Sequence, residues 1–308
     1  MDEKLRIVVS GGGTGGHIFP AVSIANAIKA KHPDAEILFV GALGRMEMER
    51  VPQAGYEIVG LPVRGLIRPL WSPKNVGVLI DFLRSKHKVR KVLKDFRPMA
   101  AVGVGGYASA ATLNAAHAMG VPCLIQEQNS YAGVTNKVLA SGADKICVAY
   151  DGMERFFPAD KIIKTGNPVR QSLIESTISV EDARKSFGLD PDKKTVVFVG
   201  GSLGARTVNE SILRHLDLVE QAKDIQFIWQ TGKYYNASIN KEIEGKKPGN
   251  LLVTDFISDM GAAYKAADLV ISRAGASSIS EFCLIGKPVV LVPSPNVAED
   301  HQTKNAMA

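Results

Sequence analysis

Short apolar runs alternate with glycine-rich turns and helical segments along nearly the whole chain. The first set predicts a helix from Pro20 to about Lys31 and strands at 5–9, 37–40, 101–104 and 122–125. The second set predicts helices at 180–187, 205–215 and 276–284 and strands at 195–199, 226–230, 251–253, 269–271 and 288–292. Runs that are apolar throughout are typical of parallel strands covered on both faces. Two such series predict an α/β protein with two doubly wound sheets.

A turn in the sequence Thr165-Gly166-Asn167-Pro168 separates the two series. We therefore predict an N-terminal domain over 1–164 and a C-terminal domain over 165–308. Ligands of open α/β sheets bind beyond the carboxyl ends of the strands. Two Rossmann-like domains facing across a cleft would place the ligand in that cleft.

Composition excludes an intrinsically disordered, collagen-like or coiled-coil protein. The chain has 308 residues, of which 45% are hydrophobic and 22% charged, as in ordinary globular proteins. Cys123, Cys147 and Cys283 form neither a disulfide framework nor a zinc-ligand pattern, which favours a reducing cytosol. The start, MDEKLRIVVS, predicts no signal peptide. Residues 99–125 carry no Asp, Glu, Lys or Arg, but glycines and a proline interrupt them, which predicts strand, turn, helix and strand and no membrane span.

Positive charge is concentrated in the first half of the chain. Residues 1–164 hold 21 Lys and Arg against 14 Asp and Glu, a net +7, while 165–308 hold 16 against 17, a net −1. The run RSKHKVRKVLKDFR at 84–97 is either a solvated helix face or the attraction for an anionic partner. An apolar composition poor in aromatic residues argues against nucleic acid as that partner.

Apolar residues lie beside basic ones just before this run. The segment LIRPLW at 66–71 and the residues Val78, Leu79, Phe82 and Leu83 are accompanied by Arg64, Arg68, Lys74 and Arg84. An ordinary amphipathic helix packed on the core would explain this pattern. The alternative is an interfacial patch that contacts an anionic membrane surface.

Three glycine clusters follow predicted strands: GGGTGG at 11–16, GVGG at 103–106 and GGSLG at 200–204. Glycines here allow a close approach of backbone N–H groups to a ligand, and the following helix adds its positive end, which favours phosphate binding. The first cluster contains G-x-G-x-x-G, but the second strand ends in Gly41-Ala42-Leu43-Gly44 without the acid that holds a dinucleotide ribose. The third cluster lacks the lysine of a P-loop.

Polar side chains near these turns are candidates for chemistry. His17 ends the first glycine turn and is a residue type that transfers protons in enzymes, although it could equally satisfy backbone groups at a helix end. Glu127-Gln128-Asn129 follows another strand, and Glu281 would lie one to two turns into a helix that starts near Gly275, where it could bind ribose hydroxyls.

The sequence favours binding of a diphosphate without a metal ion. Asp190-Pro191-Asp192 resembles a metal-binding pair of carboxylates, but it precedes a strand at the end remote from the expected ligand. No cluster of His, Cys and Glu has metal-ligand spacing. Helix ends, backbone amides, Arg170 and Arg206 could instead stabilise a departing diphosphate.

Seven motifs in order identify a resemblance: GGGTGGHIFPA, GVGGYAS, EQNSYAG, GNPVR, GGSLGAR, SRAGASSISE and DHQTKNA. Over residues 5–308 the chain resembles the MurG family of bacterial N-acetylglucosaminyltransferases. The resemblance implies a GT-B fold and inverting transfer of N-acetylglucosamine from UDP-N-acetylglucosamine to the 4-hydroxyl of the muramyl sugar of lipid I. The product would be lipid II of peptidoglycan synthesis. It also implies no metal or other cofactor and a peripheral position on the cytoplasmic face of the cell membrane.

Family positions carried over to this chain imply three groups of residues. The catalytic candidates are His17 and Glu127, and the acceptor side has Gly105, Gly106 and Tyr107. Within the donor group, Asn129 and Gln302 would contact the sugar, Arg170 and Ser202 the nucleotide diphosphate, Ile257 the uracil and Glu281 the ribose. The donor-binding candidates are Thr14, Gly15, Gly16, Asn129, Arg170, Ser202, Ile257, Ala276, Ser277, Ser278, Ile279, Ser280, Glu281 and Gln302.

Two features depart from the family pattern. Some members have paired glutamines where this chain has His301-Gln302, and members continue with further helices after the DHQTKNA motif. Three alternatives remain from the residues themselves: a related enzyme with another lipid acceptor, a UDP-sugar epimerase, and a nucleotide-binding protein without catalysis.

Overall fold

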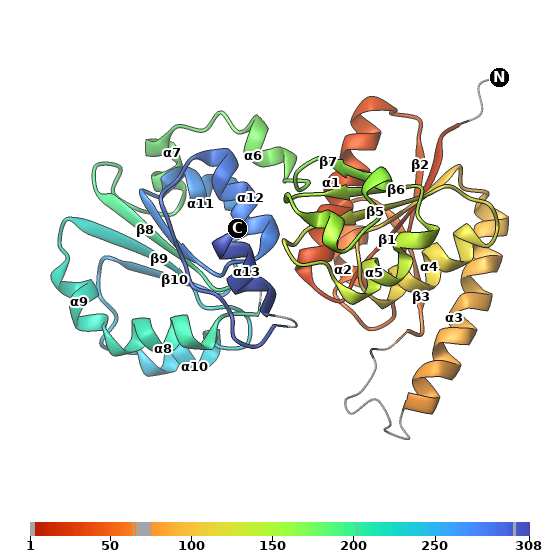
Figure 1. Ribbon diagram of the computed structural model, residues 1–308. Helices are drawn as coiled ribbons and strands as arrows, with labels where there is room; N and C mark the ends of the chain where they lie inside the picture. The colour runs from red at the N-terminus through yellow and green to blue at the C-terminus, as the bar shows by residue number, and fades with distance from the viewer. Residues whose placement is uncertain (1–3, 64, 66–74, 202, 298–299) are drawn as a thin grey trace. The chain divides into compact units, whose positions relative to one another are not determined.

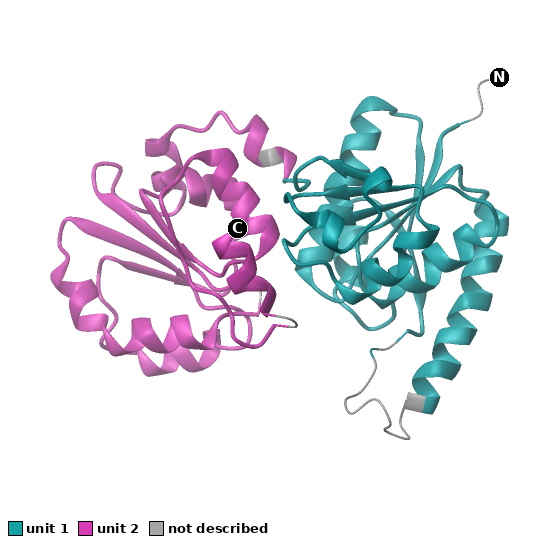
Figure 2. Ribbon diagram, viewed as in Figure 1, with its two compact units in different colours: residues 1–169 teal, residues 170–308 magenta. Residues whose placement is uncertain are grey.

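The computed structural model describes residues 4–63, 65, 75–201, 203–297 and 300–308. The chain divides into two compact units, residues 1–169 and residues 170–308 (Figure 2). Each unit has its own parallel sheet and its own hydrophobic core, and each is described below by itself.

The first unit has a seven-stranded sheet, counted over the described residues, in the order β3-β2-β1-β4-β5-β6-β7 (Figure 1). All of its paired strands run parallel. Its strands are β1 (Arg6–Ser10), β2 (Glu36–Ala42), β3 (Glu57–Leu61), β4 (Ala100–Gly103), β5 (Cys123–Glu127), β6 (Lys145–Val148) and β7 (Ile162–Lys164). Its helices are α1 (Gly15–Lys31), α2 (Glu47–Gln53), α3 (Asn75–Phe96), α4 (Tyr107–His117) and α5 (Val134–Leu139).

Strand β1 lies at the switch point of this sheet, because β2 and β3 follow on one side of it and β4 to β7 follow on the other. The chain leaves β1 toward one side and β4 toward the other, so the glycine turns that follow these strands lie next to each other. The N–H of Val104 donates to the carbonyl of Ser10 at 2.9 Å. A Cβ on Gly106 would stand 2.7 Å from the carbonyl oxygen of Gly12, so glycine is needed for this close approach.

The second unit also has a parallel sheet. Over the described residues this sheet has five strands, in the order β10-β9-β8-β11-β12. Its strands are β8 (Lys194–Val199), β9 (Ile225–Gln230), β10 (Leu251–Thr254), β11 (Leu269–Ser272) and β12 (Val289–Leu291). Its helices are α6 (Gln171–Glu175), α7 (Val180–Ser186), α8 (Arg206–Arg214), α9 (Leu216–Gln221), α10 (Asn236–Glu242), α11 (Met260–Ala266), α12 (Ala276–Ile285) and α13 (His301–Met307). Strand β8 is the switch point, so the turns after β8 and β11 adjoin.

Alternating residues of the strands build a core on each face of both sheets. In the first unit Val8 and Val40 face one cluster, while Val9 and Phe39 face another. In the second unit Val197 and Ile228 pack with α11, and Phe227 and Trp229 pack with α8 and α10. Helices cover both faces, which is why the strands read as continuous apolar runs.

The predicted fold class of two parallel α/β sheets is confirmed, and every strand that the pattern predicted is present within a few residues. The prediction that residues 99–125 form strand, turn, helix and strand is also confirmed, by β4, α4 and β5. In the described parts of the chain, no helix combines the length and the apolar character that a bilayer crossing requires.

The predicted start of the first helix at Pro20 is wrong, since α1 begins at Gly15. Proline is favoured at the first helical position, which suggested that start. Here Pro20 lies inside the helix, where its missing N–H removes a hydrogen bond to the carbonyl of Gly16. His17 consequently belongs to the first helical turn and not to the loop before it.

Candidate functional site

His17 is held by the backbone of the glycine turn that precedes it. Its Nδ1 lies 2.9 Å from the carbonyl oxygen of Gly12 and 3.5 Å from Oγ1 of Thr14. A carbonyl oxygen can only accept, so Nδ1 carries the proton and donates to Gly12. In the neutral ring Nε2 then has the free lone pair, which is the arrangement that a general base requires.

The second glycine turn lies against this imidazole. A Cβ on Gly105 would stand 2.8 Å from Nε2 of His17, and the backbone of Gly105 has φ +106°. Gly106 also has positive φ, and α4 begins at the following residue, Tyr107, whose side chain is half exposed. Of the acceptor-side candidates, Gly105 therefore lies against the catalytic candidate His17, and Gly106 lies against the carbonyl of Gly12.

Thr14, Gly15 and Gly16 form the start of α1. Thr14 is the residue before the helix, in extended conformation, and its carbonyl accepts from the N–H groups of His17 and Ile18. Thr14 and Gly16 are exposed and Gly15 is partly exposed. A ligand can reach the backbone of this helical turn.

Glu127 is buried, and its carboxylate is surrounded by donors. Oε1 accepts from the backbone N–H and the side-chain amide of Asn129, both at 3.0 Å. Oε2 accepts from the N–H of Gly133 and the side-chain amide of Asn136, both at 2.9 Å. These four hydrogen bonds fix the loop after β5 and orient Asn129, which is itself partly exposed.

Glu47 is a buried acidic residue that sequence reasoning missed. It is the first residue of α2 and is completely buried. Its Oε2 accepts from the N–H of Gly13 and its Oε1 from the N–H of Ala42, both at 3.0 Å. The local sequence shows only that Glu47 follows a predicted strand by a short loop. The pairing of β2 with β1, which brings Glu47 to the first glycine turn, has no local signal.

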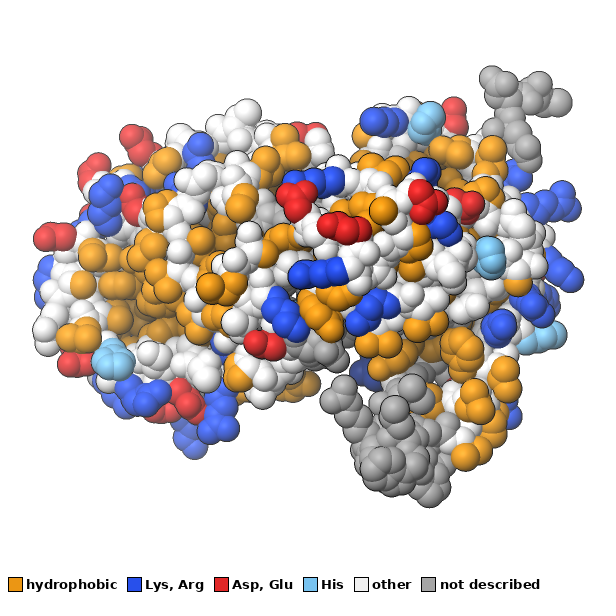
Figure 3. Space-filling view, viewed as in Figure 1, with side chains coloured by type: hydrophobic (Ala, Val, Ile, Leu, Met, Phe, Trp, Pro, Cys, Tyr) orange, Lys and Arg blue, Asp and Glu red, His pale blue; other side chains and the backbone are white. Residues whose placement is uncertain are grey.

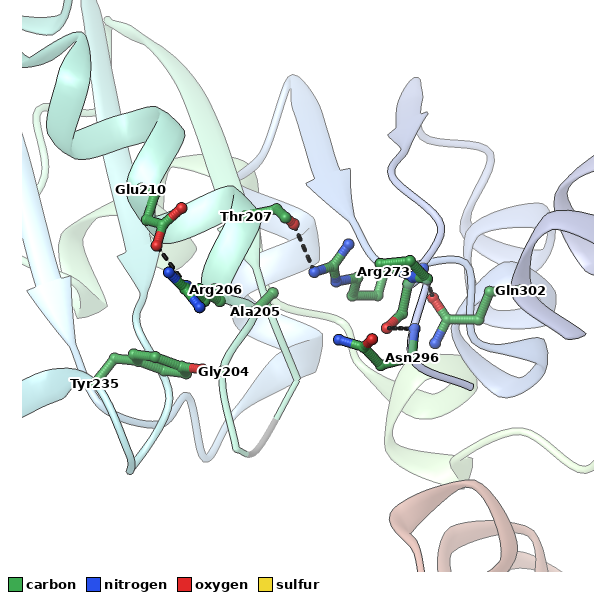
Figure 4. A pocket seen from close by; sticks show the side chains of 12 residues that line it. Gly204, Ala205, Arg206, Thr207, Glu210, Tyr235, Arg273, Asn296 and Gln302 are labelled. Carbon is green, nitrogen blue, oxygen red and sulfur yellow. Dashed lines mark hydrogen bonds and ion pairs between the residues drawn. The ribbon is translucent and has the colours of Figure 1, made fainter. Parts of the chain in front are cut away.

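The second unit contains a cavity of about 580 Å³ at the carboxyl edge of its sheet (Figure 4). The turn after β8, the start of α8, the end of β11 and the segment after β12 contribute to it. Its lining residues are Gly200, Gly204, Ala205, Arg206, Thr207, Glu210, Tyr235, Arg273, Ser294, Pro295, Asn296 and Gln302. The predicted third glycine turn thus lies at a cavity of the size that small ligands occupy. Ser202, a predicted contact of the diphosphate, lies outside the described residues.

Arg273, which sequence reasoning also missed, forms hydrogen bonds with two of the segments that line this cavity. Its Nη1 donates to the carbonyls of Val292 and Pro293 at 3.1 and 3.0 Å, and its Nη2 donates to Oγ1 of Thr207 at 2.7 Å. Partial burial lowers the pKa of Arg273, and the nearby Tyr235 opposes this. The guanidinium stays charged, because its pKa normally lies far above neutrality.

Arg170 and Glu281 form an ion pair, with Nε of Arg170 at 3.2 Å from Oε1 of Glu281. Tyr264 donates to Oε2 of the same carboxylate at 3.3 Å. Burial raises the pKa of Glu281, while Arg170 and Tyr264 work in the opposite direction. Glu281 lies in the second turn of α12, as predicted, but it is buried and faces these two residues.

The remaining donor candidates spread over α12 and two loops. Ala276 to Ser280 form the first turns of α12 behind Gly275, and Ser280 donates to the carbonyl of Ala276. Ile257 is buried in the core beside α11. Gln302 accepts from the N–H of Ser294 at 2.8 Å through Oε1, a bond that does not use its amide nitrogen. Gln302 lines the cavity, and the structure does not place Ile257 among the lining residues.

Acidic and imidazole groups are dispersed in the described residues. Within the part of the chain that the structure describes, no three His, Cys, Asp or Glu side chains come together as a metal site. Asp190 and Asp192 form a turn in which the N–H of Asp192 donates to the Asp190 carboxylate.

Two parallel α/β units with glycine turns at their switch points agree with the GT-B class of glycosyltransferases. Family models agree with this class: the glycosyltransferase family 28 N-terminal domain matches residues 7–148, and the family 28 C-terminal domain matches residues 195–308. The chain belongs to glycosyltransferase family 28.

Close relatives carry one name. The protein named UDP-N-acetylglucosamine--N-acetylmuramyl-(pentapeptide) pyrophosphoryl-undecaprenol N-acetylglucosamine transferase of Bacteroides fragilis is 66% identical over 309 residues, which is 99% of this chain and 80% of the relative. The protein of the same name from Cytophaga hutchinsonii is 57% identical over 99% of this chain and 81% of its own length.

Solved structures agree with the fold. MurG of Acinetobacter baumannii superimposes with a TM-score of 0.72 at 29% identity, covering 98% of this chain and 82% of that one. A UDP-GlcNAc 2-epimerase from Neisseria meningitidis, bound to UDP-GlcNAc, gives a TM-score of 0.66 at 14% identity over 98% of this chain and 85% of its own. At that identity the epimerase shows the fold alone.

Proposed function

We propose that this enzyme transfers N-acetylglucosamine from UDP-N-acetylglucosamine to the 4-hydroxyl of the muramyl sugar of lipid I, a muramyl peptide linked to undecaprenyl diphosphate. The product is lipid II, a precursor of peptidoglycan. The observation that carries the proposal is the identity of 56–67% with relatives of that name over nearly the whole chain. The His17 geometry agrees with the chemistry that this reaction needs.

His17 is the general base in this proposal. The carbonyl of Gly12 keeps the proton on Nδ1, so Nε2 can accept the proton of the attacking hydroxyl. The oxygen then attacks the anomeric carbon of the sugar nucleotide, the bond from that carbon to the diphosphate oxygen breaks, and the configuration inverts. UDP leaves with the electron pair.

In this proposal Glu127 positions the side chain of Asn129 and does not transfer a proton. Each of its carboxylate oxygens already accepts two hydrogen bonds within the loop, so a further proton would have to displace a donor. Its role is to hold the amide of Asn129 where it can contact the acetamido sugar. Glu127 was the second candidate for the base, and the geometry favours His17.

The cavity of the second unit is the proposed site of the UDP group. The start of α8 offers backbone N–H groups and the positive end of the helix, and Arg273 adds a positive charge, while the charge of Arg206 is paired with Glu210. These groups stabilise the charge that collects on the departing diphosphate without a bound metal ion. Gln302, with its amide nitrogen not used in the bond to Ser294, can contact a sugar hydroxyl.

The acceptor lipid requires contact with a membrane, and α3 offers the surface. Its inner face is buried through Val78, Val89 and Leu93, which accounts for the ordinary amphipathic pattern. A second apolar stripe, called the α3 stripe below, is exposed and consists of Val76, Leu79, Ile80 and Leu83. Figure 3 shows hydrophobic side chains gathered along this part of the first unit.

The spacing of the α3 stripe places its residues on one helical face, and the core does not use them. Basic residues follow in the same helix between Arg84 and Lys94. We therefore propose a peripheral position on the anionic, cytoplasmic face of the cell membrane. The segment 66–71, predicted to share in this contact, lies outside the described residues.

A coupled assay tests the reaction. UDP-N-acetylglucosamine and a short-chain lipid I analogue are incubated with the enzyme, and UDP and the disaccharide product are measured with and without EDTA. We expect equal rates in both conditions and a fall in kcat of about 100-fold or more in His17→Ala, the scale of a lost general base. His32→Ala, at the exposed opposite end of α1, is the control and should keep the wild-type rate.

Other results would contradict the proposal in distinct ways. UDP release without the lipid would indicate a hydrolase, and formation of the 2-epimer would indicate an epimerase. Transfer to a different lipid in preference to lipid I would indicate a related acceptor. Loss of activity with EDTA would contradict a metal-independent reaction.

A further inference from the structure

A buried carboxylate reaches the catalytic imidazole through a single peptide group. The peptide bond between Gly12 and Gly13 has its N–H on Gly13 and its C=O on Gly12. The N–H donates to Oε2 of Glu47 at 3.0 Å, and the C=O accepts from Nδ1 of His17 at 2.9 Å. Glu47, the peptide and His17 therefore form one continuous chain of hydrogen bonds.

Glu47 is fixed in this position by the packing around it. Its other oxygen accepts from the N–H of Ala42 at 3.0 Å, and none of the residue is exposed. A Cβ on Gly12 would stand 2.0 Å from Oε1, and a Cβ on Gly41 would stand 2.6 Å from Cγ of Glu47. Two glycines thus leave room for the carboxylate, and any side chain at either position would displace it.

A charged acceptor at one end of a peptide strengthens the hydrogen bond at the other. The negative charge on Glu47 draws electron density of the peptide toward its carbonyl oxygen, and chains of hydrogen bonds polarise one another in a buried environment. The carbonyl of Gly12 becomes a better acceptor for the Nδ1–H of His17. Because the two ring nitrogens of neutral histidine share one proton, this favours the tautomer in which Nε2 is free.

We propose that Glu47 is a positioning residue that fixes the tautomer and orientation of His17 through the Gly12–Gly13 peptide. This inference rests on the proposed function for its kinetic consequence, but the tautomer itself can be measured without any reaction. Glu47 is completely buried, and in this arrangement it acts only through the turn.

The same contact changes the interpretation of the first glycine turn. Its sequence suggested that the turn could bind a phosphate group. The N–H of Gly13 is instead used by an internal carboxylate, and a buried negative charge beside the turn opposes the binding of another anion. In this proposal the turn serves to align the base.

The first measurement needs no change at Glu47. Nitrogen NMR of protein labelled with ¹⁵N-histidine distinguishes the two neutral tautomers, and the signal of His17 is identified by its loss in His17→Ala. We expect the Nδ1–H form of His17 to predominate in the wild-type protein. Predominance of the Nε2–H form would overturn the proposal.

Glu47→Gln tests the role of the carboxylate. The amide has nearly the same shape, but it offers one oxygen to two N–H donors and carries no charge. We expect a gain of the Nε2–H tautomer of His17 and a fall in kcat of about tenfold, with KM for UDP-N-acetylglucosamine changed less than about twofold. Glu49→Gln, an exposed acid in the same helix, is the control and should change neither tautomer nor kcat.

The outcomes separate this proposal from the function itself. An unchanged tautomer and an unchanged kcat in a folded Glu47→Gln protein would overturn the positioning role, whereas lipid II synthesis would stand. A shifted tautomer in an enzyme that proves to have another acceptor would support the positioning role, whereas the proposed substrate would fail. If Glu47→Gln does not fold, the wild-type tautomer decides.

Discussion

Arg273 joins three segments of the second unit through one planar group. Its guanidinium reaches the carbonyls of Val292 and Pro293 after β12 and the hydroxyl of Thr207 at the start of α8. The fork of donors matches these acceptors in fixed directions, which an ammonium group cannot reproduce. The shape of the cavity at the start of α8 therefore depends on this side chain as well as on its charge.

Replacement of Arg273 by lysine keeps the positive charge and removes the planar set of guanidinium N–H donors. We expect Arg273→Lys to raise KM for UDP-N-acetylglucosamine about tenfold, which corresponds to about 1.4 kcal/mol of binding, with a smaller effect on kcat. Steady-state kinetics with varied sugar nucleotide measure this. Arg214→Lys, on an exposed position of α8, should leave KM unchanged. An unchanged KM in Arg273→Lys would show that charge alone matters there.

Glycines and His17 could be found from the sequence because their chemistry is visible next to a predicted strand end. Glu47 and Arg273 could not be assigned in that way. The contact of Glu47 depends on the parallel pairing of β1 with β2, which brings the loop after β2 under the first glycine turn. Likewise, Arg273 acquires its partners only when β12 pairs beside β11. The pairing of strands that are distant in the sequence cannot be predicted from the spacing of neighbouring residues.

At the scale of elements, Asp268 connects two strands and a helix of the second unit. Just before β11, its carboxylate pairs with Arg184 of α7 at 2.7 Å and with Lys194 of β8 at 3.1 Å. It also accepts from the N–H of Thr195 at 2.8 Å. Partial burial raises the pKa of Asp268, but the hydrogen bonds from Thr195 and Lys194 and the charge of Arg184 outweigh it, so the pKa is lowered overall.

A lowered pKa in the folded state has a defined consequence for stability. The contribution of Asp268 is fully present above its unfolded pKa of about 3.9 and is lost as the pH falls through the lower folded value. We expect Asp268→Asn to lower the free energy of unfolding of the second unit by about 2 kcal/mol at neutral pH, because Arg184 is buried and loses its charged partner. The difference from wild type should shrink steadily below about pH 4.

Trp229 provides the measurement. It is completely buried in the second unit, and the chain has two tryptophans, so a Trp71→Phe background leaves Trp229 as the reporter of urea unfolding. Lys194→Gln is the control, because its exposed ion pair should contribute less than about 1 kcal/mol. A difference between wild type and Asp268→Asn that stays constant from neutral pH to pH 3 would contradict the proposed linkage.

The strands that were missed carry a weak apolar signal of their own, whereas the edge strands β10 and β12, which are rich in apolar residues, were predicted. Strands β1, β4 and β8 lie inside their sheets, and most of their residues are apolar. The missed strands are β3, β6 and β7: β3 contains Glu57 and Gly60, and β7 at the sheet edge is short and mostly exposed. Such strands form because a neighbour offers hydrogen bonds, and their own sequence carries little signal.

At the scale of the whole molecule, charge and apolar surface are distributed unequally. The first 164 residues carry a net charge of +7, and the rest carry −1. The α3 stripe lies in the positive part, with its residues 45–63% exposed in a helix whose other face is already buried in the core. An apolar stripe inserts into the lipid interface at short range, whereas the net charge acts over the Debye length of about 10 Å at 0.1 M salt.

These two contributions can be separated by co-sedimentation with vesicles. Each lysine or arginine near an anionic surface contributes about 1 kcal/mol, and this attraction is screened by salt. We expect binding to vesicles rich in phosphatidylglycerol to exceed binding to neutral vesicles and to weaken as NaCl increases.

The double variant Leu79→Asp/Leu83→Asp should bind at least about tenfold more weakly, because burying one such side chain contributes about 1.5–3 kcal/mol. The matched control, Leu218→Asp, changes a leucine of similar exposure on α9 in the second unit and should bind like wild type. Both proteins should keep their activity on a water-soluble acceptor analogue, since neither change touches His17 or the cavity. If the double variant binds anionic vesicles as wild type does and the binding ignores salt, α3 is not the membrane contact, and the lipid acceptor must be reached through another surface.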